Sequence, residues 1–187
     1  MKNCLLFSCV ITFFILHVNN VMAQKVSKAN SYDMLVGVDT LNYRFDFTDF
    51  AIDGQDPKSY FLLKDPKFAD NPNEGLKIFY QKVEASFMWG IKKSKFGKSK
   101  RRLDNKNPQR FEIVILFDEV EEDGGHKAIV KLIDKENGKK QIAEIIDNEC
   151  GGKFNQFINL FSEELQESGD AIGKKLSRLF DQANHTY

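Results

Sequence analysis

The chain has 187 residues, of which 42% are hydrophobic and 29% are charged, and this composition suits one globular domain with its own core. Its 27 basic and 27 acidic residues cancel, so the whole-molecule charge favours neither a polyanionic nor a polycationic partner. Any such partner is expected at a local patch. Seventeen Phe against one Trp predict a core that is filled largely by Phe.

Residues 1–23 have the pattern of a cleaved export signal. Lys2 gives a basic start, residues 4–17 form an apolar run, and a small-x-small sequence ends at Ala23. The apolar run is shorter than the roughly 20 residues that a membrane-spanning helix needs. We therefore expect cleavage after Ala23, a mature protein that begins at Gln24, a periplasmic or secreted location, and no transmembrane segment after cleavage.

The cysteines are consistent with export. Cys4 and Cys9 leave with the signal, and neither lies in a sequence typical of lipid attachment. Cys150 is then the one cysteine of the mature protein, so an intramolecular disulfide is excluded.

The mature chain is predicted to form one domain. Residues 24–34 are polar and without period, which predicts a flexible leader. The domain then spans residues 35–181, and residues 182–187 form a C-terminal tail.

The first predicted strand covers residues 41–48, where apolar and polar side chains alternate. The apolar residues that follow are one residue out of register, which predicts a bulge or break near Asp49. Asp53-Gly54 predicts a turn, and residues 60–63 a further short strand.

A helix is predicted from Pro72 to about Phe87 or Gly90. Asn71 is its N-cap, a proline takes the first helical position, and Glu74 completes a capping box. Trp89 lies off the apolar stripe, so either the helix has ended by then or the indole is exposed. If Trp89 has only a structural role, we expect its indole to cap the edge of the core. The stripe consists of Leu76, Phe79, Tyr80, Val83 and Phe87.

Residues 92–110 are rich in lysine and arginine, with Asp104 as their single acidic residue. Gly97, Pro108 and the lack of a sustained apolar period predict a basic loop. The compensating acidic residues gather at residues 118–123, in a predicted hairpin.

This basic loop is the strongest candidate for a binding site. Its cations could hold the phosphates of lipopolysaccharide, anionic lipid or nucleic acid, with Phe96 and Leu103 as apolar contacts. An export signal makes nucleic acid the least suitable of these ligands. The alternative is a solvated loop that balances the acidic hairpin. The candidate ligand-binding residues are Lys92, Lys93, Lys98, Lys100, Arg101, Arg102 and Trp89.

Three strands follow, over residues 111–117, 128–133 and 141–146. The first is apolar on both faces in all but one position, as expected of a central strand. Gly124-Gly125 and Asn137-Gly138 supply the turns between them, because glycine and asparagine tolerate φ > 0. We therefore predict an antiparallel meander.

A long amphipathic helix is predicted over residues 153–180. Ser168 and Gly169 fall inside its apolar stripe, and we expect these small residues to let the helix backbone approach the sheet. Each glycine costs about 1 kcal/mol of helix propensity relative to Ala, so the alternative is two helices broken at residues 168–170. The stripe consists of Phe154, Phe157, Ile158, Phe161, Leu165, Ile172, Leu176 and Leu179.

No catalytic or metal-binding set is predicted. Cys150 precedes a predicted helix N-terminus, where the helix dipole favours a thiolate, but a thiol nucleophile also needs a base. His126 lies two strands away and His185 lies in the tail, so a thiol enzyme that uses Cys150 is only a remote alternative to a half-buried structural cysteine. Two histidines and one cysteine make no zinc set, and residues 118–123 lack a calcium-loop pattern. We expect no cofactor and, beyond weak cation attraction at the acidic hairpin, no metal.

One stretch of the chain supports a family resemblance. A strand ends at residues 132–134, a turn follows at Asn137-Gly138, and a second strand leads through Gly151-Gly152 into a helix rich in small residues. This succession resembles the C-terminal half of exported α/β domains of Gram-negative envelope proteins, among them curli-secretion-like, flagellar outer-membrane accessory and uncharacterised families. The resemblance implies an assembly or binding role without catalysis. This chain differs from many such proteins because it lacks a lipid-anchoring cysteine.

The sequence therefore predicts an α+β domain, with an antiparallel sheet of four to six strands and two helices packed on it. The expected function is that of a non-enzymatic exported protein that binds or assembles with another envelope component. The alternative is a binder of lipopolysaccharide, anionic lipid or anionic polysaccharide through the basic loop.

Overall fold

The computed structural model describes residues 32–64, 66–151 and 157–184. The predicted signal and most of the predicted leader lie outside these residues. The elements are, in chain order, η1 (Tyr32–Leu35), β1 (Thr40–Phe45), α2 (Pro57–Lys64), η2 (Pro66–Asp70), α3 (Pro72–Lys93), α4 (Lys95–Lys98), β2 (Arg102–Leu103), β3 (Phe111–Asp118), β4 (His126–Asp134), β5 (Lys140–Glu149) and α5 (Phe157–Asn184).

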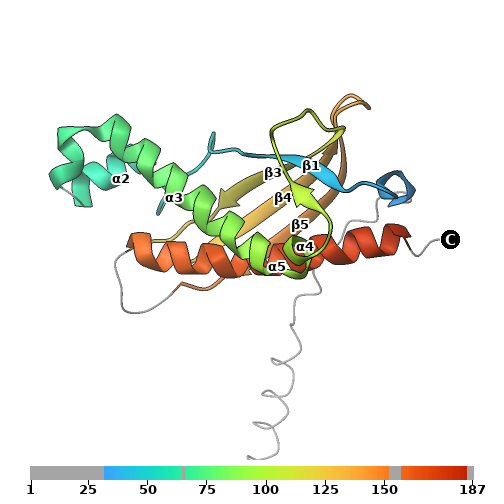
Figure 1. Cartoon of the computed structure of the whole chain (residues 1–187). Helices are drawn as coiled ribbons and strands as arrows, with labels where there is room; N and C mark the ends of the chain where they lie inside the picture. Colours follow the sequence, from blue (N-terminus) through green and yellow to red (C-terminus); the bar gives the residue numbers. More distant parts are fainter. Residues whose placement is uncertain (1–31, 65, 152–156, 185–187) are drawn as a thin grey trace, which may run out of the picture.

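The fold is α+β, built on one five-stranded sheet in the order β2-β1-β3-β4-β5. The long helices α3 and α5 cover the same face of this sheet (Figure 1). Their apolar sides and the inward side chains of the strands form one hydrophobic core. The prediction of two helices packed on the sheet is confirmed, and the described chain adds the short helices α2 and α4.

The sheet is mixed, so the prediction of an antiparallel sheet is wrong in this respect. The strands β3, β4 and β5 form the predicted antiparallel meander, and β3 is the central strand. The strand β1, however, pairs in parallel with both β3 and β2. The chain between β1 and β3 passes through α3, and such a crossover lets two neighbouring strands run in the same direction.

The segment after β1 is shorter in strand and richer in helix than predicted. The strand ends at Phe45, and Asp46 then accepts hydrogen bonds from the backbone and hydroxyl of Thr48 (3.2 and 2.7 Å), which turns the chain. Residues 60–63, predicted as a strand, lie in α2. The Asp56 carboxylate accepts from Ser59 N (3.1 Å) as an N-cap, a helix-start signal that precedes Pro57.

The helix α3 begins as predicted and ends later. Asn71 Oδ1 accepts from Glu74 N (3.4 Å), which confirms the N-cap. The helix continues to Lys93 because Ile91 extends the apolar stripe and is buried at 2% exposure. Trp89 therefore lies on the helix with its side chain exposed (46%), so the interpretation of an indole at the core edge is wrong.

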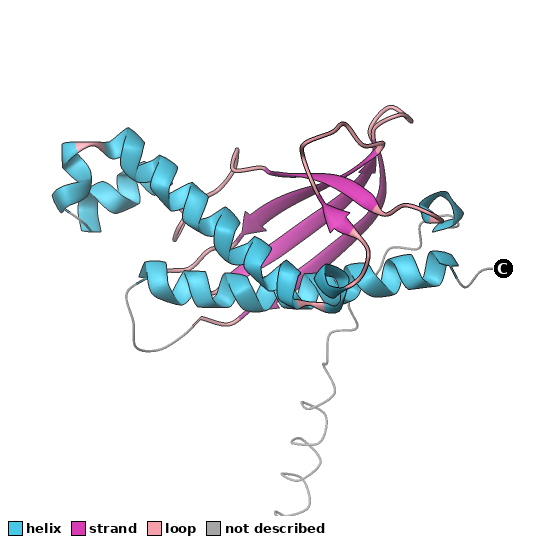
Figure 2. Cartoon of the chain, viewed as in Figure 1, coloured by secondary structure: helices cyan, strands magenta, loops and turns pink. Residues whose placement is uncertain are grey.

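The helix α5 is continuous through Ser168 and Gly169, as predicted. Ser168 contacts His126 of β4 and so faces the sheet, whereas Gly169 faces α3. A Cβ atom on Gly169 would lie 2.2 Å from the Phe87 carbonyl oxygen, and one on Gly90 would lie 2.1 Å from the Gln166 carbonyl oxygen. The small residues thus let two helix backbones touch where α3 and α5 cross (Figure 2).

Phenylalanine fills much of the core, as the composition predicts. Phe161 stacks on Phe157 with ring centroids 5.3 Å apart and packs edge-on against Phe117 of β3 at 6.2 Å. Phe87 of α3 contacts Phe117 at 5.5 Å. These rings connect both helices to the central strand.

The domain extends beyond its predicted limits. Residues 32–34, predicted to be leader, belong to η1, where Leu35 is buried at 1% exposure. At the other end, α5 runs into the predicted tail, and Ala183 is fully buried. In Figure 1, η1 lies beside the C-terminal end of α5.

Candidate functional site

The basic segment of residues 92–110 is a loop only in part, because regular structure interrupts it at three places. Lys92 and Lys93 form the last turn of α3, α4 is a short helical turn, and β2 pairs with the edge of β1. Phe96 is buried at 1% exposure and anchors α4 in the core. The sequence did not reveal that Phe96 is an anchor, because a single aromatic residue among cations produces no hydrophobic periodicity.

Three cations of the basic segment pair with acids, and these acids are not those of the predicted hairpin. Asp181 of α5 pairs with Lys95 (3.0 Å) and with Arg101 (3.3 Å). Arg110 pairs with Asp134 at the end of β4 (2.7 Å). Acids of the predicted hairpin instead meet Lys64, through Glu122 at 2.6 Å, and Lys127, through Asp118 at 3.7 Å and Glu119 at 3.4 Å.

Three of the predicted binding residues meet at one pocket of about 380 Å³, next to the sheet edge. Lys92, Arg101 and Arg102 line it together with Lys106, and Asp104 is the one acid among the lining residues. The apolar part of the lining consists of Met88, Ile91, Phe96 and Leu103. We call this site the basic pocket.

The cations of the basic pocket differ in whether they already have an interaction partner. Arg101 is held in place, because its guanidinium pairs with Asp181 and lies 5.1 Å from the centroid of the Phe180 ring. The side chains of Lys92, Arg102 and Lys106 have no partner among the described residues. One fixed and three unpaired cations therefore surround an apolar floor.

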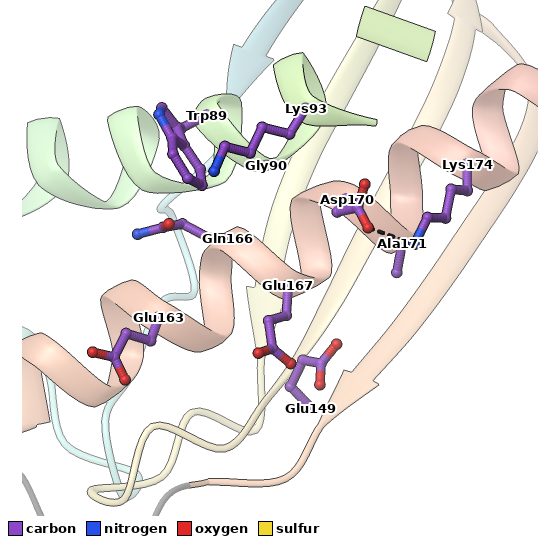
Figure 3. Close-up of a pocket in the computed structure, with 10 residues that line it drawn as sticks. All are labelled: Trp89, Gly90, Lys93, Glu149, Glu163, Gln166, Glu167, Asp170, Ala171 and Lys174. Carbon is purple, nitrogen blue, oxygen red and sulfur yellow. Dashed lines mark ion pairs between the residues drawn. The ribbon is translucent and has the colours of Figure 1, made fainter. Parts of the chain in front are cut away.

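The other predicted residues lie elsewhere. Trp89 and Lys93 line a second pocket of about 730 Å³ between α3 and α5 (Figure 3), and Lys93 Nζ lies 3.3 Å from the centroid of the indole ring. Such a cation–π contact occupies the face of the indole. Lys98 and Lys100 are exposed and line neither of these two pockets.

The second pocket is mainly acidic. Glu149 from β5 and Glu163 and Glu167 from α5 line it, and Figure 3 shows the carboxylates of Glu149 and Glu167 close together. Asp170 is paired with Lys174 (2.5 Å). Burial, followed by the neighbouring acids, raises the pKa of Glu149 to about 8.

A buried acid, Asp147, lies two residues before Glu149 on β5. Asp147 is 6% exposed, and Lys175 of α5 donates to its Oδ1 and to the Ile146 carbonyl oxygen (2.9 Å for the latter). Its other oxygen, Oδ2, is buried without a hydrogen-bond partner among the described residues. A buried carboxylate oxygen in this state is costly unless a proton or a cation approaches it.

Cys150 is exposed, not half-buried as predicted. It lines a pocket of about 540 Å³ that His126 also lines, because β4 and β5 place His126 beside Glu149 in register. The imidazole is 4% exposed, and both its nitrogens are engaged: Nδ1 donates to the Gly124 carbonyl (3.0 Å), and Nε2 lies 2.9 Å from Ser168 Oγ. Burial lowers the pKa of His126. Within the described part of the chain, the thiol and the imidazole form no pair.

Compared with protein-family models, with curated proteins and with solved structures, the chain shows no match. The resemblance to exported envelope proteins therefore stays a prediction. Across the described residues, none of the helices has the length and apolar character needed to cross a membrane.

Proposed function

We propose that the protein is a non-enzymatic binding protein that holds an anionic amphiphile in the basic pocket. The observation that carries this proposal is that Lys92, Arg102 and Lys106, which have no side-chain partner among the described residues, line one pocket together with apolar side chains. Cations alone would suit any polyanion. An apolar floor adds selectivity for a ligand whose charged group is attached to hydrocarbon.

The size and chemistry of the pocket narrow the ligand further. About 380 Å³ lies near the lower end of small-ligand pockets, so it suits a head group with its first methylene groups better than a whole lipid. The guanidinium of Arg102 can bind a phosphate with two parallel hydrogen bonds, and Lys92 and Lys106 add point charges. A phosphate-bearing lipid or lipopolysaccharide has this chemistry.

The export signal supports the same class of ligand. A periplasmic or secreted protein meets lipopolysaccharide, anionic lipid and anionic polysaccharide, and it meets little nucleic acid. Of these ligands, the polysaccharide lacks hydrocarbon for the floor formed by Met88, Ile91 and Leu103.

The test compares two pairs of substitutions that remove the same charge. The full mature protein is incubated with vesicles of phosphatidylglycerol or of phosphatidylcholine, and with lipopolysaccharide, and the bound fraction is measured by sedimentation at two salt concentrations. Lys92→Gln/Arg102→Gln should weaken binding about tenfold at low salt, because two charge-assisted contacts are lost. Lys98→Gln/Lys100→Gln should change it little. Equal losses in both variants would mean that binding is diffuse and would overturn the proposal.

A second candidate function is the envelope interaction or assembly module, and the outer face of the sheet favours it. This face carries Leu116, Ile129, Ile133 and Ile146, all partly exposed, among charged neighbours. Both long helices lie on the opposite face (Figure 2). If this face binds a protein, Ile129→Lys should abolish co-purification with an envelope partner, or self-association in light scattering, without loss of folding. An inert monomer in both experiments would count against this candidate.

A further inference from the structure

Three carboxylates from two different elements converge at the seam between α5 and β5. Glu164 and Glu167 are three residues apart on one side of α5, and Glu149 comes from the end of β5. One oxygen from each lies within 4.8 Å of the others. The nearby cations are already engaged: Lys175 pairs with Asp147, Lys174 pairs with Asp170, and Lys93 lies over the indole ring of Trp89. The seam therefore has an excess of negative charge.

A buried oxygen lies next to this group. Asp147 Oδ2 has no hydrogen-bond partner among the described residues, and the Asp147 carboxyl reaches the Glu149 carboxyl two positions along the same strand face. Acidic residues on a surface commonly occur without a ligand. A buried carboxylate oxygen without a donor, on a carboxyl that adjoins Glu149, is a separate observation: a proton or a second cation is needed beside it.

We propose that Glu149, Glu164 and Glu167 form a binding site for a divalent cation, with Ca²⁺ as the best fit and the Asp147 carboxylate as its inner neighbour. All contacting atoms are carboxylate oxygens, which hard cations prefer and which suit Zn²⁺ poorly. The three oxygens lie within 4.8 Å of one another, so they are close enough to approach one ion together. Ca²⁺ is the better fit because it accepts about six to eight oxygens in a flexible geometry, whereas Mg²⁺ requires a near-ideal octahedron.

The rival explanation is a shared proton. Burial and the adjacent acids raise the pKa of Glu149, and burial raises that of Glu164, so a protonated Glu149 could donate to Asp147 Oδ2. The two explanations make different predictions. A site that only shares a proton gains no stability from Ca²⁺, whereas a cation site gains stability in proportion to the logarithm of the Ca²⁺ concentration above its dissociation constant.

The experiment measures thermal unfolding of the chelator-treated mature protein with and without about 1 mM Ca²⁺, the range in which extracellular calcium modules bind. Ca²⁺ should raise the unfolding midpoint of the wild type, and Mg²⁺ should raise it less. Glu164→Gln/Glu167→Gln should lose this shift. Glu163→Gln is the matched control, because Glu163 lies on the same helix and lines the same pocket as Glu167 without belonging to the cluster.

A second readout uses the single tryptophan. Trp89 lines the same pocket as Glu149 and Glu167, so Tb³⁺, a luminescent substitute for Ca²⁺, should be excited through the indole. The signal should be lost in Glu164→Gln/Glu167→Gln and kept in Glu163→Gln. The proposal is overturned if Ca²⁺ does not shift the wild type, if the double variant keeps the shift, or if Glu163→Gln loses it equally. These results are independent of the basic pocket, which shares no residue with this site.

Discussion

A single buried acid organises the turn between β4 and β5. Asp134 is 1% exposed and accepts two hydrogen bonds from the Arg110 guanidinium (3.1 and 2.7 Å). It also accepts from Glu136 N (3.1 Å) and from the Asn137 side chain (2.6 Å). These donors, led by Arg110, lower the pKa of Asp134 to about 2. The carboxylate thereby joins the basic segment to the hairpin.

The pKa of Asp134 predicts a pH-dependent contribution to stability. Because its folded-state pKa lies below the unfolded value of about 3.9, the ionised group stabilises the fold by about 2 kcal/mol above pH 5, and this contribution is lost as the pH falls towards 2. In urea unfolding, Asp134→Asn should therefore be less stable than the wild type by about 2 kcal/mol at pH 7, with the difference shrinking below about pH 4. Glu136→Gln, which changes an exposed partner of Arg110, is the control and should be nearly neutral. A difference that stays constant down to pH 2 would contradict this assignment.

At the scale of residues, the density of charge in the sequence pointed to three of the residues that line the basic pocket. Lys92, Arg101 and Arg102 do meet at one pocket, because they lie on either side of a single helical turn. Lys98 is just as basic in sequence but points elsewhere, and sequence spacing alone could not separate the two cases. The cluster of Glu149, Glu164 and Glu167 depends on how α5 lies along β5, which no local pattern encodes.

At the scale of elements, the crossing of α3 and α5 determines the shape of the domain. Ser86 and Ser162 share a hydrogen bond across it (2.6 Å), and Gly90 and Gly169 let the backbones touch. A side chain at either glycine would meet a backbone carbonyl oxygen of the other helix, which cannot rotate away.

This contact predicts whether replacing Gly90 or Gly169 by alanine raises or lowers the free energy of unfolding. Helix propensity alone would make Gly→Ala stabilising by about 1 kcal/mol, whereas overpacking against backbone costs about 1–3 kcal/mol or more. Gly90→Ala and Gly169→Ala should each lower the free energy of unfolding in chemical denaturation. Gly75→Ala in α3 is the control, because its nearest neighbours are atoms of the Phe68 ring, which can move. Stabilisation by Gly169→Ala would show that the helices do not touch as described.

Local patterns predicted the elements better than their arrangement. The cap at Asn71 and the apolar stripe located α3, and the turn residues between β3, β4 and β5 located the meander. The parallel pairing of β1 with β3 was not predictable from alternation, since alternation is the same for both strand directions. The short strand β2 was missed because two residues are too few to show a period.

At the scale of the whole molecule, the net charge is zero, but basic and acidic residues gather at opposite edges of the sheet. The basic pocket lies between the end of α3 and the sheet edge at β2, whereas the acidic seam lies between α5 and the opposite edge strand β5. Each proposed site therefore has its own local field, and added salt should weaken both.

The two ends of the described chain also lie side by side, since η1 packs beside the C-terminal part of α5. This contact predicts that the domain unfolds in one cooperative transition. Leu35 of η1 is 1% exposed in the core beside the C-terminal part of α5, so Leu35→Ala removes apolar contacts and should cost about 2–5 kcal/mol. If the chain is one cooperative domain, the loss should appear equally in far-ultraviolet circular dichroism and in the fluorescence of Trp89, which lies on α3. Val36→Ala changes the adjacent exposed residue (41%) and should be nearly neutral. Two separate transitions, or equal losses in both variants, would mean that η1 is not part of the core.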